Sequence, residues 1–403
     1  LVIFVLALVF RIKPAKAFRS ALVVGIGFVG VFAIFSLMGE QIGPAAQAIV
    51  ERTGLSLPAV DLGWAPLSAI TWGSPIAPFA IVLTLLINLV MLAAKWTKTI
   101  DIDIWNYWHF AFAGCLVYVA TGNFALGLLG SAIAAVIIIK IADWCAPLVQ
   151  KYCNLPGISL PTLSSAVFFP IGLLGNWILD KVPGINRLHA DPETIQKRFG
   201  IFGEPIFMGL ILGCILGALA GYDIGKTIQV GMAMAGVMVL MPRMVKLLME
   251  GLIPISEAAR NFLQKRFGED SENSKLYIGL DAAVTTGHPA VIATALILVP
   301  LTLLLAVILP GNNMLPFGDL ATIPFFVAMI VAAARGNIIH SVLSGLVVIG
   351  VCLLMGTALA EFQTSMGVTA NFKMPEGAAL ISSIDQAGNL VNFIIFKLIS
   401  LFA

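Results

Sequence analysis

Hydrophobic residues in this chain gather into long runs, and polar residues are confined to short intervals between them. Residues 76–94, 205–221 and 336–360 contain no Asp, Glu, Lys or Arg. A helix needs about 20 apolar residues to cross the hydrocarbon core of a bilayer, so such runs predict transmembrane helices. We therefore predict an all-α polytopic membrane protein with about eleven transmembrane segments. The predicted segments are residues 1–10 (partial), 20–38, 74–94, 106–120, 124–142, 163–179, 203–221, 227–248, 289–309, 322–334 and 337–360, with a further partial one after residue 389.

Three other stretches, residues 40–68, 155–165 and 275–289, are apolar but interrupted by glycine and proline. Irregular backbone at membrane depth persists only where protein or a wet cavity satisfies its N–H and C=O groups. We therefore expect these stretches to form re-entrant hairpins that line a substrate path.

Two of the broken segments match each other in sequence. Residues 69–75 (AITWGSP) align with residues 283–289 (AVTTGHP) at an offset of 214, and each copy runs directly into a long apolar segment. Paired broken segments in corresponding halves are typical of transporter binding sites. We therefore predict one membrane unit over residues 1–403, built from two structural repeats, residues 1–200 and 201–403. Chance similarity between two apolar helix starts is the alternative.

Composition and charge agree with a membrane location. Of the 403 residues, 59% are hydrophobic and 11% are charged, whereas soluble domains carry about 25% charged residues. This excludes a soluble enzyme, a disordered chain and a secreted disulfide scaffold. The net charge of +2 provides no field that would recruit nucleic acid. Basic residues within 11–19 and 243–275 are expected in the cytoplasm. Because the apolar runs at both ends are short, we expect both ends of the chain to be truncated.

One polar strip beside an apolar segment covers Asp101–His109. On a helix, Trp105, Trp108 and His109 would share one face, as would Asn106 and His109. Aromatic rings stack on the C–H faces of a polyol, while amide and imidazole groups bond its hydroxyls. The strip therefore predicts a polyol contact, with an interfacial aromatic belt as the alternative reading of the tryptophans.

Asp281 is the strongest single candidate for a site residue. It precedes a stretch of 37 residues, 282–318, without formal charge. An acid at membrane depth costs several kcal/mol unless it is paired or serves a wet site, so it indicates function. Placement among the lipid headgroups is the alternative. The polar strip around it comprises Thr285, Thr286 and His288, and the matched strip of the other half comprises Thr71, Trp72 and Ser74.

A third strip, residues 156–165, is broken by two prolines and leaves the hydroxyls of Ser159, Thr162 and Ser164 available. Further single candidates are Glu204, Asp319 and the pair Asp385 and Gln386. Glu204 and Asp319 could equally cap helix starts, because acids favour the first turn of a helix.

The sequence contains no motif typical of metal binding, redox chemistry, nucleotide hydrolysis or serine hydrolases. The five cysteines have neither zinc-site nor redox spacing, and no P-loop, HExxH or GxSxG motif occurs. We therefore expect no metal site, no cofactor and no nucleotide hydrolysis by this chain.

Short motifs of a known family are spread over nearly the whole chain: Gly25–Gly30, Ile42–Ala46, Asp103–His109, Phe199–Pro205, Leu240–Arg243, Ile278–Asp281, Gly287–His288 and Leu309–Ile323. Together they resemble the galactitol-specific IIC permease components of the bacterial phosphoenolpyruvate-dependent sugar phosphotransferase system, in the ascorbate–galactitol superfamily. The resemblance implies a homodimer, surrounded by lipid, in the cytoplasmic (inner) membrane. It also implies a sugar-holding core domain that moves elevator-fashion against a dimerising scaffold, both interleaved across the two halves.

The same resemblance implies that separate soluble IIA and IIB subunits supply phosphate and that a IIB phosphocysteine donates it. This chain would be the transport component and would hold no phosphoryl-carrying residue of its own. By position, the ligand would be galactitol or a similar polyol, held by the strips of the hairpins, by Asn106 and His109, and by Asp281. As a carboxylate, Asp281 would accept from the ligand hydroxyls and act as general base.

Two other functions remain open at this stage. A cation-coupled secondary transporter of a polyol, or of a sugar acid such as ascorbate, would use Asp281, Glu204 or His109 as its proton site. A channel or a purely structural membrane protein is disfavoured by the broken segments and the intramembrane acid.

Overall fold

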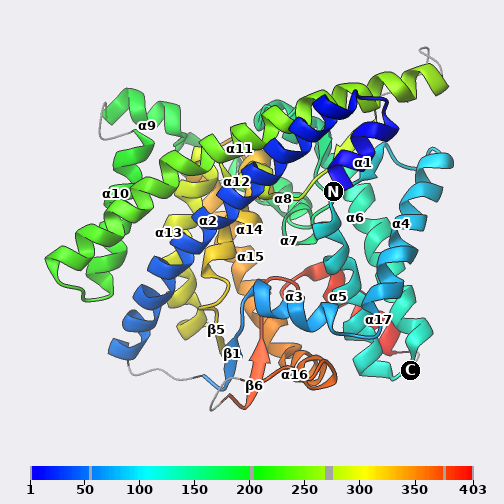
Figure 1. Ribbon diagram of the computed structural model, residues 1–403. Coiled ribbons are helices and arrows are strands. Elements are labelled where there is room, and N and C mark those ends of the chain that lie inside the picture. Colours follow the sequence, from blue (N-terminus) through cyan, green and yellow to red (C-terminus); the bar gives the residue numbers. More distant parts are fainter. Residues whose placement is uncertain (1, 54–56, 200–203, 268–275, 375–377, 402–403) are drawn as a thin grey trace.

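The computed structural model describes residues 2–53, 57–199, 204–267, 276–374 and 378–401. Most of these residues are helical (Figure 1). The helices are α1 (Val2–Val9), α2 (Pro14–Thr53), α3 (Trp64–Trp72), α4 (Ala77–Ala93), α5 (Ile104–Thr121), α6 (Phe124–Tyr152), α7 (Leu163–Ala166), α8 (Phe169–Leu179), η1 (Ile185–Arg187), α9 (Pro192–Phe199), α10 (Pro205–Leu219), α11 (Ile224–Phe267), α12 (Ala283–Thr286), α13 (Pro289–Ile308), η4 (Leu320–Thr322), α14 (Ile323–Ala333), α15 (Ile338–Ala358), α16 (Ala360–Thr369) and α17 (Leu390–Ser400).

Several helices are apolar and long enough to cross a membrane. Among the described residues there are five by length and composition, or six if α3 and α4, bent by 94° at their break, form one span. This confirms a helical membrane protein, but it does not give eleven separate spans. Hydropathy alone cannot distinguish a full span from a shorter apolar helix such as α10 or α17, because both bury the same residue types.

The hairpin predicted for residues 40–68 does not begin at residue 40. Residues 40–53 continue α2 without interruption, although Pro44 lies inside the helix, so the prediction of a break beginning at residue 40 is wrong. Proline is tolerated in membrane helices where neighbouring groups satisfy the freed carbonyl. The break occurs between Trp72 and Ala77, where α3 ends and α4 begins.

Six short strands, absent from the all-α prediction, follow or precede the breaks. They are β1 (Ala59–Asp61), β2 (Thr99–Asp101), β3 (Ile158–Ser159), β4 (Tyr277–Gly279), β5 (Met314–Leu315) and β6 (Leu380–Ser382). They form two parallel sheets in the orders β5-β1-β6 and β2-β4-β3. In the first sheet Ala59 pairs with Met314 and Leu380; in the second, Ile278 pairs with Ile100 and Ile158. Each central strand thus comes from one half of the chain and its two neighbours from the other half.

The long helices α2 and α11 run side by side obliquely across the molecule, with α1 and α10 packed on them (Figure 1). Glycines allow this close approach. A Cβ on Gly213 of α10 would lie 2.8 Å from the Cα of Gly231 in α11, and one on Gly27 of α2 would lie 2.7 Å from the Cα of Leu248. Small residues let membrane helices pack backbone to backbone. We call α1, α2, α10 and α11 the four-helix unit.

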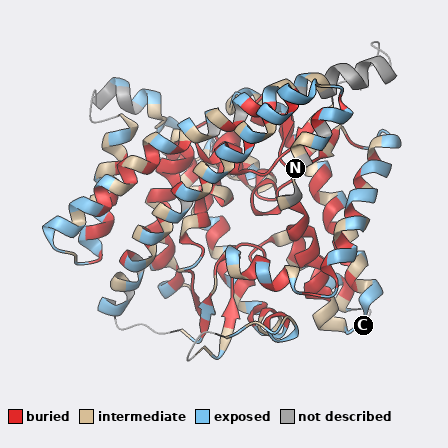
Figure 2. Ribbon diagram, in the orientation of Figure 1, coloured by how far each residue is buried: buried red, intermediate tan, exposed pale blue. Residues whose placement is uncertain are grey.

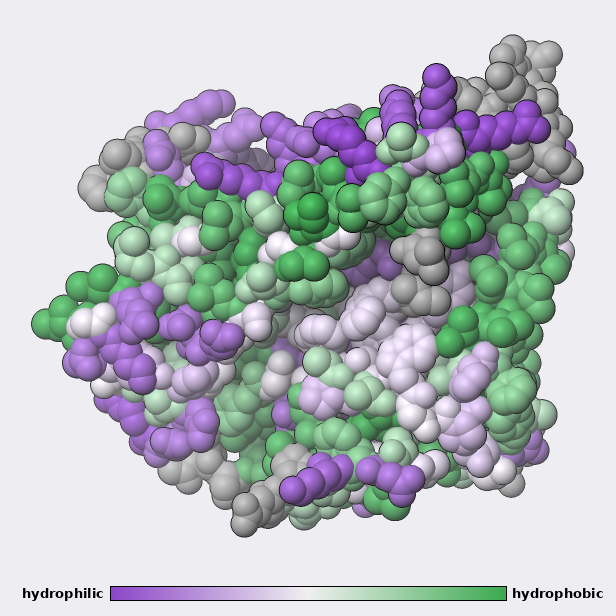
Figure 3. Space-filling view, in the orientation of Figure 1, coloured by the Kyte–Doolittle hydropathy of each residue, from purple (hydrophilic) through white to green (hydrophobic). Residues whose placement is uncertain are grey.

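Buried residues fill the interior of the helical layers (Figure 2). On the face drawn in Figure 3, hydrophobic side chains form a broad band, while hydrophilic ones follow the upper edge and gather at the lower left and along the bottom. A hydrophobic band between two polar rims is the surface expected of a protein that sits in a bilayer.

Candidate functional site

A cavity of about 490 Å³ lies between α2 and the broken segments of both halves. Its lining combines aromatic rings, carboxylates and small polar groups. The lining residues are Phe32, Ser36, Gly39, Glu40, Trp64, Trp105, Trp108, His109, Ser164, Asp281, Gly318, Ala321, Thr322, Phe325 and Asp385.

Aromatic rings form one wall of the cavity. The Trp105 ring lies 5.4 Å from that of Trp64 and 5.9 Å from that of Phe32, centroid to centroid, and 6.4 Å from that of Trp108. Asp103 caps α5 by accepting the Trp105 N–H at 3.1 Å, so Trp105 lies in the capped first turn of that helix and Trp108 in the second. Trp105 and Trp108 lie on the cavity together with His109, as the helical spacing predicts.

Two glycines fit the two halves together at this site. Gly63, which directly precedes α3, has a φ of 73°, a left-handed conformation that favours glycine. A Cβ on Gly63 would lie 2.6 Å from the Gly318 carbonyl oxygen. The start of α3, and therefore the Trp64 ring, is held against the segment that follows β5.

Buried carboxylates contribute the acceptors. The Asp281 Oδ1 accepts the Ala283 N–H at 2.8 Å, and the Asp281 N–H donates to Asp103 Oδ2 at 3.0 Å. The Asp385 N–H donates to Asp319 Oδ2 at 3.2 Å. These two lining acids follow β4 and β6, and the backbone N–H of each donates to an acid that does not line the cavity. Hydrogen bonds of this kind fix a carboxylate in place.

A chain of hydrogen bonds orients His109. Gln386 Nε2 donates to Ser164 Oγ at 2.9 Å, and Ser164 Oγ lies 3.4 Å from His109 Nε2. The Ser164 hydroxyl therefore links Gln386 to the His109 ring. Within the described part of the chain, His109 Nδ1 and the neighbouring Trp108 Nε1 are buried and have no partner. Unpaired buried polar atoms are costly, so these two nitrogens indicate a missing hydrogen-bonding partner.

Two of the predicted residues, Thr162 and Asn106, hold the backbone next to the cavity without lining it. Thr162 Oγ1 accepts the Ala282 N–H at 2.9 Å and lies 2.9 Å from Asn106 Oδ1. Asn106 Nδ2 in turn donates to Asp101 Oδ1 at 3.0 Å. Neither Thr162 nor Asn106 belongs to the lining, but together they position the backbone that carries Asp281.

Most hydroxyls of the two matched strips are bonded locally instead. Thr71 donates to the Leu67 carbonyl, Thr285 to the Ala282 carbonyl and Thr286 to the Ala283 carbonyl, at 2.7–2.9 Å. These three residues do not line the cavity, and the same is true of Ser74, whose Oγ accepts the Ile76 N–H. The half-buried Trp72 is likewise outside the lining.

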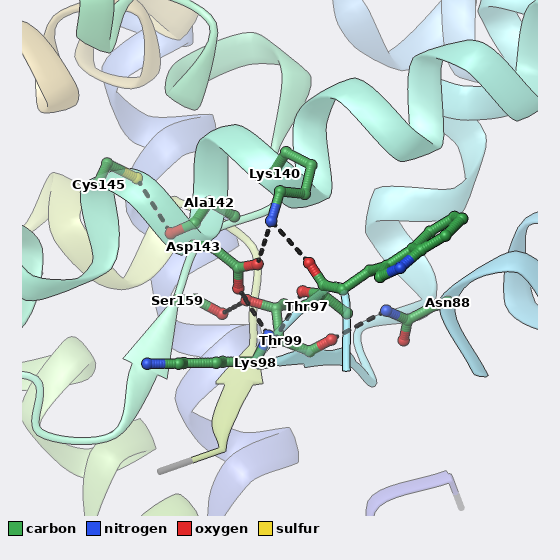
Figure 4. A network of polar contacts seen from close by, with 10 residues as sticks. Asn88, Thr97, Lys98, Thr99, Lys140, Ala142, Asp143, Cys145 and Ser159 are labelled. Carbon is green, nitrogen blue, oxygen red and sulfur yellow. Dashed lines mark hydrogen bonds and ion pairs between the residues drawn. The ribbon is translucent and has the colours of Figure 1, made fainter. Parts of the chain in front are cut away.

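The remaining predicted residues also lie away from the cavity. His288 caps α13, its Nδ1 accepting the Ala290 N–H at 3.2 Å. Glu204 occupies the N-cap position of α10 without a side-chain capping bond. Ser159 belongs to the network of Figure 4, where the Thr99 Oγ1 lies 2.9 Å from both Ser159 Oγ and Asp143 Oδ1. That network fastens β2 and β3 to α6.

The lining residues that sequence reasoning overlooked include Phe32, Trp64 and Glu40. Glu40 had a clear signal, because it is the only formally charged residue between Arg19 and Glu51. The two aromatic residues had none, since the sequence does not show which face of an apolar helix meets a cavity. Among the described residues, no group of three or more His, Cys, Asp or Glu could hold a metal ion.

The chain resembles known proteins over its whole length. Residues 1–377 match the family model EIIC-GAT, the PTS system sugar-specific permease component. The chain is 40% identical over 400 residues to the PTS system galactitol-specific EIIC component of Escherichia coli K12, covering 99% of this chain and 87% of that protein. It is also 38% identical over 401 residues to a putative permease IIC component of Escherichia coli K12, covering 100% of this chain and 91% of that protein.

Proposed function

Because this chain belongs to the family of sugar-specific permease components of the phosphotransferase system, we propose that its cavity binds galactitol or a similar polyol. As a member of that family with several membrane-spanning helices, the chain is a multi-pass permease of the bacterial inner membrane. The galactitol specificity comes from the relative of that name, with which this chain shares 40% of its residues.

The observation that carries the proposal is the composition of the cavity wall. Tryptophan rings and two buried carboxylates line the same cavity, and Trp108 and His109 each leave a buried nitrogen without a partner. The hydroxyls of a polyol both donate and accept, so they can satisfy the acids and these two nitrogens together, while C–H faces stack on the rings. No lysine or arginine occurs among the described lining residues, which favours a neutral ligand over a sugar acid.

Asp281 is the residue we assign to the chemistry. It accepts from the ligand hydroxyls, and it takes the proton of the hydroxyl that attacks phosphorus. The phosphocysteine of a soluble IIB subunit is the donor: a P–O bond to the polyol forms, the P–S bond breaks, and the thiolate leaves. A IIA subunit recharges IIB. The charged polyol phosphate cannot recross the membrane.

The architecture supports the remaining family expectations. The reciprocal sheets, in which each half inserts one strand between two strands of the other, support two repeats, residues 1–200 and 201–403. We assign the four-helix unit as the dimerising scaffold of a homodimer and the other helices as the sugar-holding core. The cavity lies between them, as an elevator-type movement of the core requires.

Reconstituted vesicles test this function. With IIA, IIB, the soluble phosphoryl carriers and phosphoenolpyruvate on the cytoplasmic side, we expect labelled galactitol to accumulate on that side as its phosphate. Without phosphoenolpyruvate, a proton gradient should give no accumulation. Gradient-driven accumulation of unmodified galactitol would instead establish a cation-coupled transporter.

A further inference from the structure

Glu40 is a charged residue within α2, just beyond the most apolar part of that helix. Between Arg19 and Glu51 it is the only formally charged residue, and the span Pro14–Ile49 that contains it passes the length and hydropathy test for a membrane helix. Its side chain is exposed and lines the cavity, together with Ser36 and Gly39 of the same helix face. Charged residues within membrane helices are rare and mark water-filled paths and sites.

Helix α2 presents Glu40 to the cavity from the side opposite the breaks. Gly39 lies close to η4, since a Cβ on it would be 3.7 Å from the Ala321 Cβ. Asp281 and Asp385 belong to the broken segments, whereas Glu40 belongs to the four-helix unit. The cavity therefore has acidic groups on both of the parts that enclose it.

The three lining acids differ in their surroundings. Asp281 and Asp385 are buried, and each lies beside another carboxyl group, Asp103 and Asp319 respectively. Glu40 is exposed, so water solvates its charge. It is the lining residue best placed to act on a ligand through charge, and no described lysine or arginine of the lining offsets it.

We propose that Glu40 determines the charge selectivity of the cavity, so that neutral polyols are admitted and anions are repelled. This inference rests on the proposed function and deepens it. Sugar acids would be excluded by their carboxylate. The phosphorylated product would be repelled more strongly, because its phosphate carries nearly two charges, and the same residue would thus promote product release and oppose rebinding. Like charges within about 8 Å in a partly dry site change affinity by about tenfold per unit charge.

The experiment compares binding of a neutral and an anionic ligand. The purified full chain in detergent is titrated calorimetrically with galactitol, galactonate and galactitol phosphate, at about 20 mM and at about 1 M salt, between which the Debye length falls to about 3 Å. The variants are Glu40→Gln and a matched control, Glu51→Gln. Glu51 is an exposed acid about three turns further along α2 and outside the cavity lining.

At low salt we expect Glu40→Gln to raise the affinity for galactonate relative to galactitol by about tenfold, and that for galactitol phosphate by more. Most of this gain should disappear at high salt, because salt screens the repulsion between charges. A gain caused by a change in the shape of the cavity would persist at high salt. Glu51→Gln should keep the ratio of the unchanged chain. If all three proteins bind galactitol with the same ratio of galactonate to galactitol affinity, the role of Glu40 is overturned while the proposed function stands. Failure of the unchanged chain to bind galactitol would overturn the proposed function, and this inference with it.

Discussion

Replacing Asp281 with asparagine should lower galactitol affinity by about 10-fold to 100-fold and should reduce phosphorylation further. The loss of affinity follows from removing a charged acceptor, since hydrogen bonds to charged groups contribute about 1.5–3 kcal/mol. The further loss of rate follows from removing the proton acceptor, because a positioned general base contributes about 10²-fold to 10⁴-fold. Galactitol titration and single-turnover phosphorylation by phospho-IIB measure the two effects separately.

The substitution should leave the fold intact. An asparagine oxygen can still accept the Ala283 N–H, and its amide can donate to the Thr162 oxygen, which lies 3.5 Å from Asp281 Oδ2. Thr285→Ala is the matched control, because that hydroxyl lies four residues away and bonds only the Ala282 carbonyl among the described contacts. A Thr285→Ala loss as large as that of Asp281→Asn would place the ligand at the hairpin strips and contradict the site.

Trp105→Leu should lower galactitol affinity by about tenfold. The indole packs against the Trp64 and Phe32 rings on the cavity wall, and leucine keeps much of its apolar volume while removing the flat stacking face. Ring packing of this kind contributes about 0.5–1.5 kcal/mol beyond buried area. The loss should appear in titration and in the quenching of tryptophan fluorescence by galactitol.

Trp177→Leu provides the comparison for this ring. Trp177 lies on α8, is 56% exposed and is absent from the cavity lining. Its replacement should leave the galactitol affinity within about twofold of the unchanged chain, because surface substitutions rarely propagate. Equal affinities of the two variants would show that the Trp105 ring does not contact the ligand.

The sequence predicted the helices better than their connections. The runs at 74–94, 203–221 and 289–309 correspond closely to α4, α10 and α13, because a membrane helix must satisfy its backbone internally and be apolar throughout. The strands escaped prediction, since two or three residues cannot show the alternation that marks a strand. Their partners also lie in the other half of the chain, as Ala59 and Met314 do.

Only some of the predicted site residues line the cavity, for a local reason. Asp281, His109 and Ser164 line the cavity, whereas Thr71 and Thr285 bond carbonyls of their own helical turn. A hydroxyl in an apolar segment has both options, and sequence does not choose between them. Asp385 was only one of several single acids, and its place on the cavity depends on the register that joins β6 to β1.

A structure of the full chain determined with galactitol tests the central claim most directly. We expect density for one extended polyol in the cavity, with its carbon chain against Trp105 and Trp108 and its hydroxyls within hydrogen-bonding distance of Asp281 and Asp385. Density elsewhere, with this cavity filled only by water at saturating galactitol, would contradict the account.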